Sequence, residues 1–161
     1  MNFSSLLSKS QIILDMCSSE HDEAIVELIN ILVKNEVICK ESKNEILDSL
    51  LFREGQNSTG IGSGIAIPHI FTDCVTVATA AFGRSKSGIE FDAIDNALVN
   101  SIFLLILPNA ERCQHLQTLA SISKFFSKAD ARESLTSART KQEIIEILEQ
   151  IGQDGTEEAD C

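Results

Sequence analysis

Residues 58–69 form the segment of this chain whose composition is best suited to chemistry. Three glycines fall within five residues of it, and the whole segment reads Ser58-Thr59-Gly60-Ile61-Gly62-Ser63-Gly64-Ile65-Ala66-Ile67-Pro68-His69. Glycines let backbone amides approach an anion closely because no Cβ intervenes. The chain then reaches His69 through Pro68, whose ring fixes its own φ. The pattern predicts a rigidly held imidazole beside an anion-binding loop, a candidate phosphoryl acceptor; the alternative for the loop is a plain tight turn.

Phosphoryl transfer needs a nucleophile and groups that balance the transferred charge. A neutral imidazole is a competent nucleophile near pH 7, which favours His69. Arg53 precedes the loop, and its guanidinium matches phosphate geometry; the alternative is a solvated arginine at a helix end. His115 follows a predicted strand, where a lone histidine is more often structural. His21 falls in the first turn of an exposed predicted helix and is interpreted as a surface residue.

The loop supplies four candidate phosphate-binding residues, namely Ser58, Thr59, Gly60 and Gly62. It lacks the Lys-Ser/Thr ending of a nucleotide P-loop and precedes a strand rather than a helix, which disfavours nucleotide binding. Residues 91–96, with two aspartates and an asparagine, are interpreted as a capped turn rather than a metal site. We therefore expect neither a cofactor nor a metal.

Charge and hydropathy exclude several classes of function. The net charge of −11 has no offsetting Lys/Arg cluster, which argues against nucleic acid. No apolar run approaches the roughly 20 residues of a membrane span. No signal peptide is apparent, so we expect a cytoplasmic protein. The five cysteines lie far apart, and their odd number favours reduced thiols.

Hydrophobic periodicity predicts alternating helices and strands. Strands are expected at 11–14, 65–67, 75–82, 89–91 and 99–107, with a turn over 83–88, and helices at 20–34, 43–54, 111–126, 130–138 and 141–151. Helix caps are predicted at Ser19, Ser42 (with Glu45), Asp130 and Thr140 (with Glu143). Helices before and after a block of strands can cover both faces of one mixed sheet, an α+β fold with three α/β/α layers. We expect one domain over 1–151 and an acidic, disordered tail over 152–161.

Several segments together carry a family resemblance: Arg53-Glu54, Ser58–Gly62, Gly64–His69, Phe91–Asn96, Leu105–Pro108, His115-Leu116 and Thr118-Leu119. They resemble the enzyme IIA domain of the bacterial phosphotransferase system, fructose/mannitol class. The nitrogen-regulatory branch (the PtsN type) is the most similar. The match spans roughly residues 3–151, nearly the whole chain.

The resemblance implies the α/β/α sandwich of this enzyme IIA type and a phosphoryl group accepted on His69 from a histidine-phosphorylated HPr-like carrier. It assigns Arg53 and His115 to binding or balancing that group. Family precedent points to the tele nitrogen of His69, which the sequence itself leaves open. The chain departs from the family pattern in one place: Ile70-Phe71 stands where relatives commonly have glycine and a basic residue. These two residues either form a docking surface or pack inward.

Three functions remain open at this point. The first is a regulatory phosphocarrier whose phosphorylation changes which target proteins bind. The second is a soluble IIA component of fructose-type sugar uptake, which would pass the phosphoryl group to a cysteine of a separate IIB. The third is a binding module of the same fold that is not phosphorylated.

Overall fold

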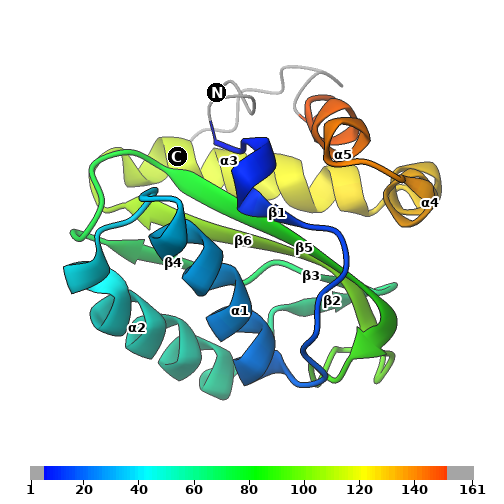
Figure 1. Ribbon diagram of the computed structural model, residues 1–161, viewed down its shortest axis with the longest axis horizontal. Helices are drawn as coiled ribbons and strands as arrows, with labels where there is room; N and C mark the ends of the chain where they lie inside the picture. Colours follow the sequence, from blue (N-terminus) through cyan, green and yellow to red (C-terminus); the bar gives the residue numbers. More distant parts are fainter. Residues whose placement is uncertain (1–5, 152–161) are drawn as a thin grey trace.

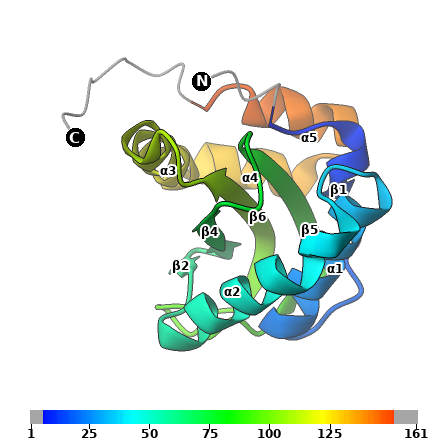
Figure 2. The same ribbon diagram turned by 90° about the vertical axis from the view of Figure 1, so that its left-hand side faces the viewer.

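A computed structural model describes residues 6–151 and arranges them in three layers (Figure 1). Helices α1 (His21–Lys34) and α2 (Lys43–Gln56) cover one face of a sheet. Helices α3 (Arg112–Phe126), α4 (Ala129–Ser137) and α5 (Lys141–Leu148) cover the other, and Figure 2 shows the sheet between the two sets. The predicted α/β/α sandwich is confirmed. The tail expected over 152–161 lies outside the described residues.

The sheet of the described chain is mixed, in the order β1-β5-β6-β3-β2, with β4 also paired to β6. Its strands are β1 (Ile12–Ile13), β2 (Gly60–Gly62), β3 (Ile65–Ala66), β4 (His69–Thr72), β5 (Thr79–Ile89) and β6 (Val99–Pro108). β5 is antiparallel to β6, whereas β3 and β4 are both parallel to β6 and follow one another along the same edge. Short 3-10 helices η2 (Lys9–Gln11) and η3 (Lys40–Ser42) precede β1 and α2.

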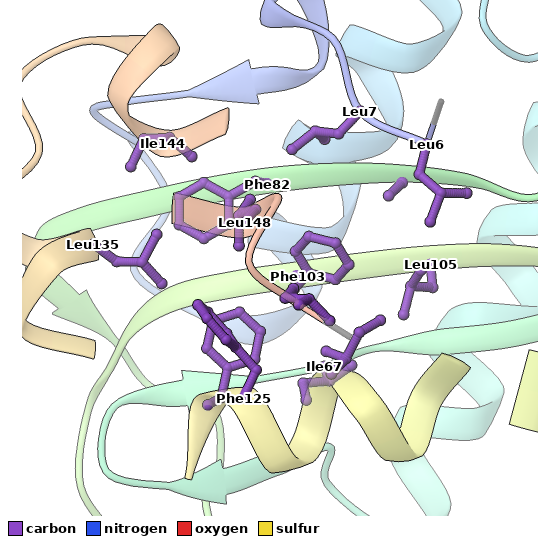
Figure 3. Close-up of a cluster of buried hydrophobic side chains, with 14 of the residues drawn as sticks. Leu6, Leu7, Ile67, Phe82, Phe103, Leu105, Phe125, Leu135, Ile144 and Leu148 are labelled. Carbon is purple, nitrogen blue, oxygen red and sulfur yellow. The ribbon is translucent and has the colours of Figure 1, made fainter. Parts of the chain in front are cut away.

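Strand β6 is the centre of the molecule, buried on both faces as predicted. Its odd-numbered residues over 103–107 join a hydrophobic cluster beneath α3–α5, and its even-numbered residues over 102–106 join a second cluster beneath α1 and α2. Figure 3 shows the first cluster, where Phe103 and Leu105 of β6 meet Phe125 of α3 and Leu148 of α5. Side chains of a strand alternate between faces, so these clusters identify the face on which any neighbouring residue lies.

The turn predicted over 83–88 is wrong, as is the separate strand at 89–91. β5 continues without interruption to Ile89. Gly83 is a packing residue, because a Cβ there would lie 2.3 Å from Met16 Sδ. Gly88 takes a left-handed φ of 88°, within the stretch from Arg84 to Ile89 where the register shifts. A glycine inside a strand can therefore mark close packing or a bulge rather than a turn.

Only one predicted cap is present among the described helices: Thr140 Oγ1 accepts a hydrogen bond from Glu143 N at 3.2 Å. Ser42 does not cap α2, because its backbone is already helical at the end of η3, whereas a cap needs an extended residue. Ser19 does not cap α1, whose first amide, His21 N, donates instead to Glu90 O at 3.0 Å. Asp130 lies inside the first turn of α4.

Two further expectations concern the membrane and the thiols. No helix in residues 6–151 has the length and apolar composition of a membrane span. Cys17, Cys39 and Cys74 are free, which confirms the prediction at these positions. Cys113 is disulfide-bonded, which contradicts it; spacing along the chain does not show which thiols the fold brings together.

Candidate active site

His69 is the first residue of β4, an edge strand, and pairs with Leu105 of β6. Ile67 belongs to the hydrophobic cluster beneath α3–α5, and Phe71 packs against that cluster. Ile70 belongs to the opposite cluster. Because side chains alternate along a strand, His69 lies on the α3 face with Ile67 and Phe71. Its half-buried ring is therefore held by regular structure rather than by a loose loop.

One hydrogen bond fixes the tautomer of His69. Its Nδ1 lies 2.7 Å from Ile67 O. A carbonyl oxygen can only accept, so Nδ1 carries the proton and Nε2 keeps its lone pair. Pro68 lies between these two residues, and its ring fixes its own φ in this turn.

The surroundings lower the pKa of His69. Burial of the ring is the largest cause, and the positive charge of Arg53 acts in the same direction. The hydrogen bond to Ile67 O and the negative charge of Glu54 raise the pKa but do not outweigh them. From an ordinary value of 6.5, a lowered pKa leaves the imidazole neutral, and hence nucleophilic, at pH 7.

Arg53 and Glu54 lie near the C-terminal end of α2, and the charges of both act on His69. Arg53 Nη1 donates to Asn57 O at 2.9 Å, so the guanidinium is held at the helix end. Glu54 is buried, and its carboxylate accepts from Thr59 N at 2.8 Å and from Thr59 Oγ1 at 2.7 Å. This pair ties α2 to the glycine segment. Sequence reasoning gave Glu54 no role of its own, since a bond across a helix end leaves no periodic signal.

The hydroxyl groups of Ser58 and Thr59 already have partners within the protein. Ser58 Oγ donates to Phe91 O and accepts from Gly60 N at 3.1 Å. The Thr59 hydroxyl donates to Glu54. Gly60 packs so closely that a Cβ would lie 2.8 Å from Ala93 Cβ. Rather than an open loop, the segment is the β2–β3 hairpin, turned at Gly62 and Gly64 with φ of 94° and 81°.

The hairpin places the four candidate phosphate-binding residues at different distances from His69. Thr59 O accepts from Ile67 N at 3.1 Å, and Gly60 pairs with Ala66, so residues 58–60 lie toward the acceptor. Gly62 pairs with Ile65, four residues before His69. At about 3.3 Å per residue, Gly62 is about 13 Å along the strand from His69. The phosphate-binding role of residues 58–60 stays a prediction, and that of Gly62 has no support from this placement.

His115 reaches the same face from α3. The Arg112 guanidinium lies over the Phe71 ring, 4.0 Å from its centroid, and at the other end of α3 Phe126 lies 6.0 Å from Phe103. α3 thus runs antiparallel to β4 and β6. His115, one turn after Arg112, is displaced from Phe71 back toward His69. The charge of Arg53 acts on His69, and α3 carries His115 toward the same edge strand.

His115 is 4% exposed, and neither ring nitrogen has a hydrogen-bond partner among the described residues. The buried residues of α3 are His115, Thr118, Ile122, Phe125 and Phe126. A polar residue does not register in a hydrophobic periodicity, so the sequence pattern alone does not show that His115 is buried. A buried imidazole without partners retains its capacity to bind a polar group.

The remaining predicted residues lie apart from the acceptor. His21 Nδ1 lies 2.5 Å from Asp22 Oδ1, and its ring meets Phe91 edge-on. Asp95 accepts hydrogen bonds from Ser63 N at 2.9 Å and from Ala97 N at 3.1 Å. Both bonds lower the pKa of Asp95, and the bond from Ser63 has the larger effect. The interpretation of residues 91–96 as a turn is confirmed. No group of three or more candidate metal ligands occurs in the described chain.

Comparison with known proteins identifies the family. Residues 5–151 match the family model described as "Phosphoenolpyruvate-dependent sugar phosphotransferase system, EIIA 2". The chain belongs to this family. It is a phosphotransferase component of the fructose/mannitol-type class, as the sequence motifs indicated.

Individual relatives carry two kinds of name. A fructose-specific EIIA component from Haloferax volcanii is 40% identical over 69% of this chain and 72% of its own length. A nitrogen regulatory protein from Pseudomonas aeruginosa is 36% identical over 64% of this chain and 67% of its own. Among solved structures, nitrogen regulatory protein IIA-Ntr from Neisseria meningitidis superposes with a TM-score of 0.84 at 33% identity, covering 91% of this chain and 98% of that one.

Proposed function

We propose that this chain is a regulatory, nitrogen-type enzyme IIA that accepts a phosphoryl group on Nε2 of His69 from a histidine-phosphorylated, HPr-like carrier. The observation that carries the proposal is the 2.7 Å hydrogen bond between His69 Nδ1 and Ile67 O, which presents the lone pair on Nε2. The lowered pKa supplies the neutral ring that the reaction needs. Nε2 is the tele nitrogen, in agreement with the family precedent.

The transfer is a single displacement at phosphorus. The Nε2 lone pair of His69 forms the new N–P bond while the N–P bond of the donor breaks, and the donor imidazole keeps that electron pair. The His69 ring gains positive charge as the bond forms. Ile67 O, hydrogen-bonded to Nδ1–H, stabilises this charge, which is the interaction that already raises the pKa.

Two further residues act on the phosphoryl group in this proposal. Arg53 balances its negative charge with a guanidinium close enough to influence the pKa of His69. His115 donates to a phosphoryl oxygen, which gives its buried, unpartnered ring a hydrogen bond. Amides of residues 58–60 are the candidates for additional contacts.

Transfer to a IIB component of sugar uptake is the second candidate, and the 40% identity with a fructose-specific EIIA component favours it. We prefer the regulatory function because the IIA-Ntr structure covers 91% of this chain with a TM-score of 0.84. Chemistry at His69 is the same in both.

The test is incubation with phosphoenolpyruvate, enzyme I and an HPr-like carrier, followed by intact-mass and peptide analysis. We expect one phosphoryl adduct on the wild type and on the control His21→Ala, and none on His69→Ala. An adduct retained by His69→Ala, or none on the wild type, contradicts the proposal; the latter result favours a non-phosphorylated binding module. Rapid transfer from phosphorylated His69 to a sugar-specific IIB establishes the second candidate instead.

A further inference from the structure

Ile70 and Phe71 are the residues where this chain departs from its family pattern. Their side chains lie in different surroundings. Ile70 is 7% exposed and packs in the cluster beneath α1 and α2. Phe71 is half-buried, and the Arg112 guanidinium lies over its ring at 4.0 Å. An arginine over an aromatic face is attracted to the ring, so the two side chains fix one another. The departure therefore places a cation beside the acceptor strand.

Arg112 is held without a carboxylate partner in the described chain. Its Nη1 lies 3.4 Å from Asn109 Oδ1, and Asn109 Nδ2 donates to Asp73 Oδ1 at 3.0 Å. Asn109 N also donates to Thr72 O at 3.2 Å, which anchors the asparagine to the end of β4. An aromatic ring and a neutral amide thus position the guanidinium, and its remaining N–H groups stay available to an external oxyanion.

The position of Arg112 relates it to the acceptor. Phe71 and His69 lie on the same face of β4, two residues or about 7 Å apart. Arg112 is exposed at the surface, in contrast to the buried His115 one turn along α3. A phosphoryl group in transfer lies between two imidazoles, within the closed interface. An exposed guanidinium beside this site is placed to contact an incoming protein.

We propose that Arg112, positioned by Phe71, is a specificity-determining residue that binds a carboxylate on the docking face of the phosphoryl-donor protein. The inference rests on the proposed function and deepens it. With a net charge of −11, the chain as a whole repels the negative charge of a phosphorylated donor. A fixed cation near His69 offsets this repulsion locally and orients the donor, an effect that acts on association and is screened by salt.

The experiment measures phosphoryl transfer from the phosphorylated HPr-like protein at low and high salt. It compares the wild type with Arg112→Gln, Arg112→Lys and Phe71→Leu. The matched control is Arg139→Gln, which removes one exposed cation from the segment between α4 and α5. Phosphoramidate, a small phosphoryl donor without a protein surface, serves as the second substrate.

We expect Arg112→Gln to raise KM for the protein donor about 2- to 5-fold at low salt, with kcat unchanged. The effect should disappear at high salt and be absent with phosphoramidate. Phe71→Leu and Arg112→Lys should raise KM less than Arg112→Gln does, because each keeps a cation but loses the guanidinium–ring contact that positions it. If Arg112→Gln has the same KM for the protein donor as Arg139→Gln, or if it slows transfer from phosphoramidate to the same extent, this inference is wrong. The proposed function is then unaffected. A wild type that accepts no phosphoryl group overturns the proposed function and this inference with it.

Discussion

At His69, burial, one hydrogen bond and two neighbouring charges act on a single ring, and their balance lowers its pKa below 6.5. Between the folded and unfolded pKa values the folded protein binds fewer protons, so acidification below pH 6.5 destabilises it. The same balance keeps the acceptor neutral, and hence reactive, at neutral pH. Stability and reactivity at this residue therefore change together with pH.

Replacing Arg53 with glutamine should raise the pKa of His69, since the positive charge of Arg53 is one of the causes that lower it. The check is an NMR titration of the His69 ring in wild type and variant. In the wild type the midpoint should lie below 6.5. Arg139→Gln removes a cation elsewhere and should leave the midpoint where it is. A midpoint unaffected by Arg53→Gln would contradict the role assigned to this charge.

A substitution at His115 should affect phosphoryl transfer without lowering the free energy of unfolding. Both of its ring nitrogens are buried without partners in the described chain, so His115→Leu removes no hydrogen bond. We expect the free energy of unfolding to stay within about 1 kcal/mol of wild type or to rise. Phosphoryl transfer to His69 should fall at least about 10-fold, because a donor to the phosphoryl group is lost. Urea denaturation and the transfer assay measure the two effects, and a stability loss without a rate loss would make His115 structural.

At the scale of elements, the sequence predicts those helices and strands whose burial follows from their hydrophobic pattern alone. The apolar run of β6 and the repeating apolar residues of α1 specify buried elements directly. Glycines inside β5 were interpreted as a turn because the sequence does not show that Met16 packs against Gly83. The site residues were predicted through motif rather than periodicity, because a histidine such as His115 adds no hydrophobic signal to the buried face of α3.

Gly55, in the last turn of α2, and Gly60, the first residue of β2, should respond oppositely to replacement by alanine. Gly60→Ala places a Cβ 2.8 Å from Ala93 Cβ and should destabilise the protein by about 1–3 kcal/mol. Gly55→Ala, near the end of α2, meets no atom within 4 Å and should stabilise by up to about 1 kcal/mol. Thermal or urea unfolding of both variants checks this pair. Equal effects of the same sign would contradict the packing assigned to the β2–β3 hairpin.

On the scale of the whole molecule, one buried side chain connects the layers. Arg84 of β5 is 8% exposed and donates to Leu14 O at 3.2 Å, Leu135 O at 3.1 Å and Ala138 O. These carbonyls belong to the segment after β1 and to the end of α4. Since α4 packs against α3, which lies on the same face of the sheet as His69, this connection indirectly supports the face on which the acceptor lies.

Arg84→Met keeps an unbranched aliphatic stem but removes the guanidinium, so these carbonyls lose their donor. We expect a loss of about 3 kcal/mol or more in the free energy of unfolding, because each unsatisfied buried group costs about 1–3 kcal/mol. Hydrogen exchange should accelerate most in α4 and β1, where the donor was lost. Arg139→Met, at an exposed position, should change neither quantity. Arg84 lies away from His69, so the folded fraction should still accept a phosphoryl group at the wild-type rate; a rate loss greater than the loss of folded protein would show that the connection between layers also positions the acceptor.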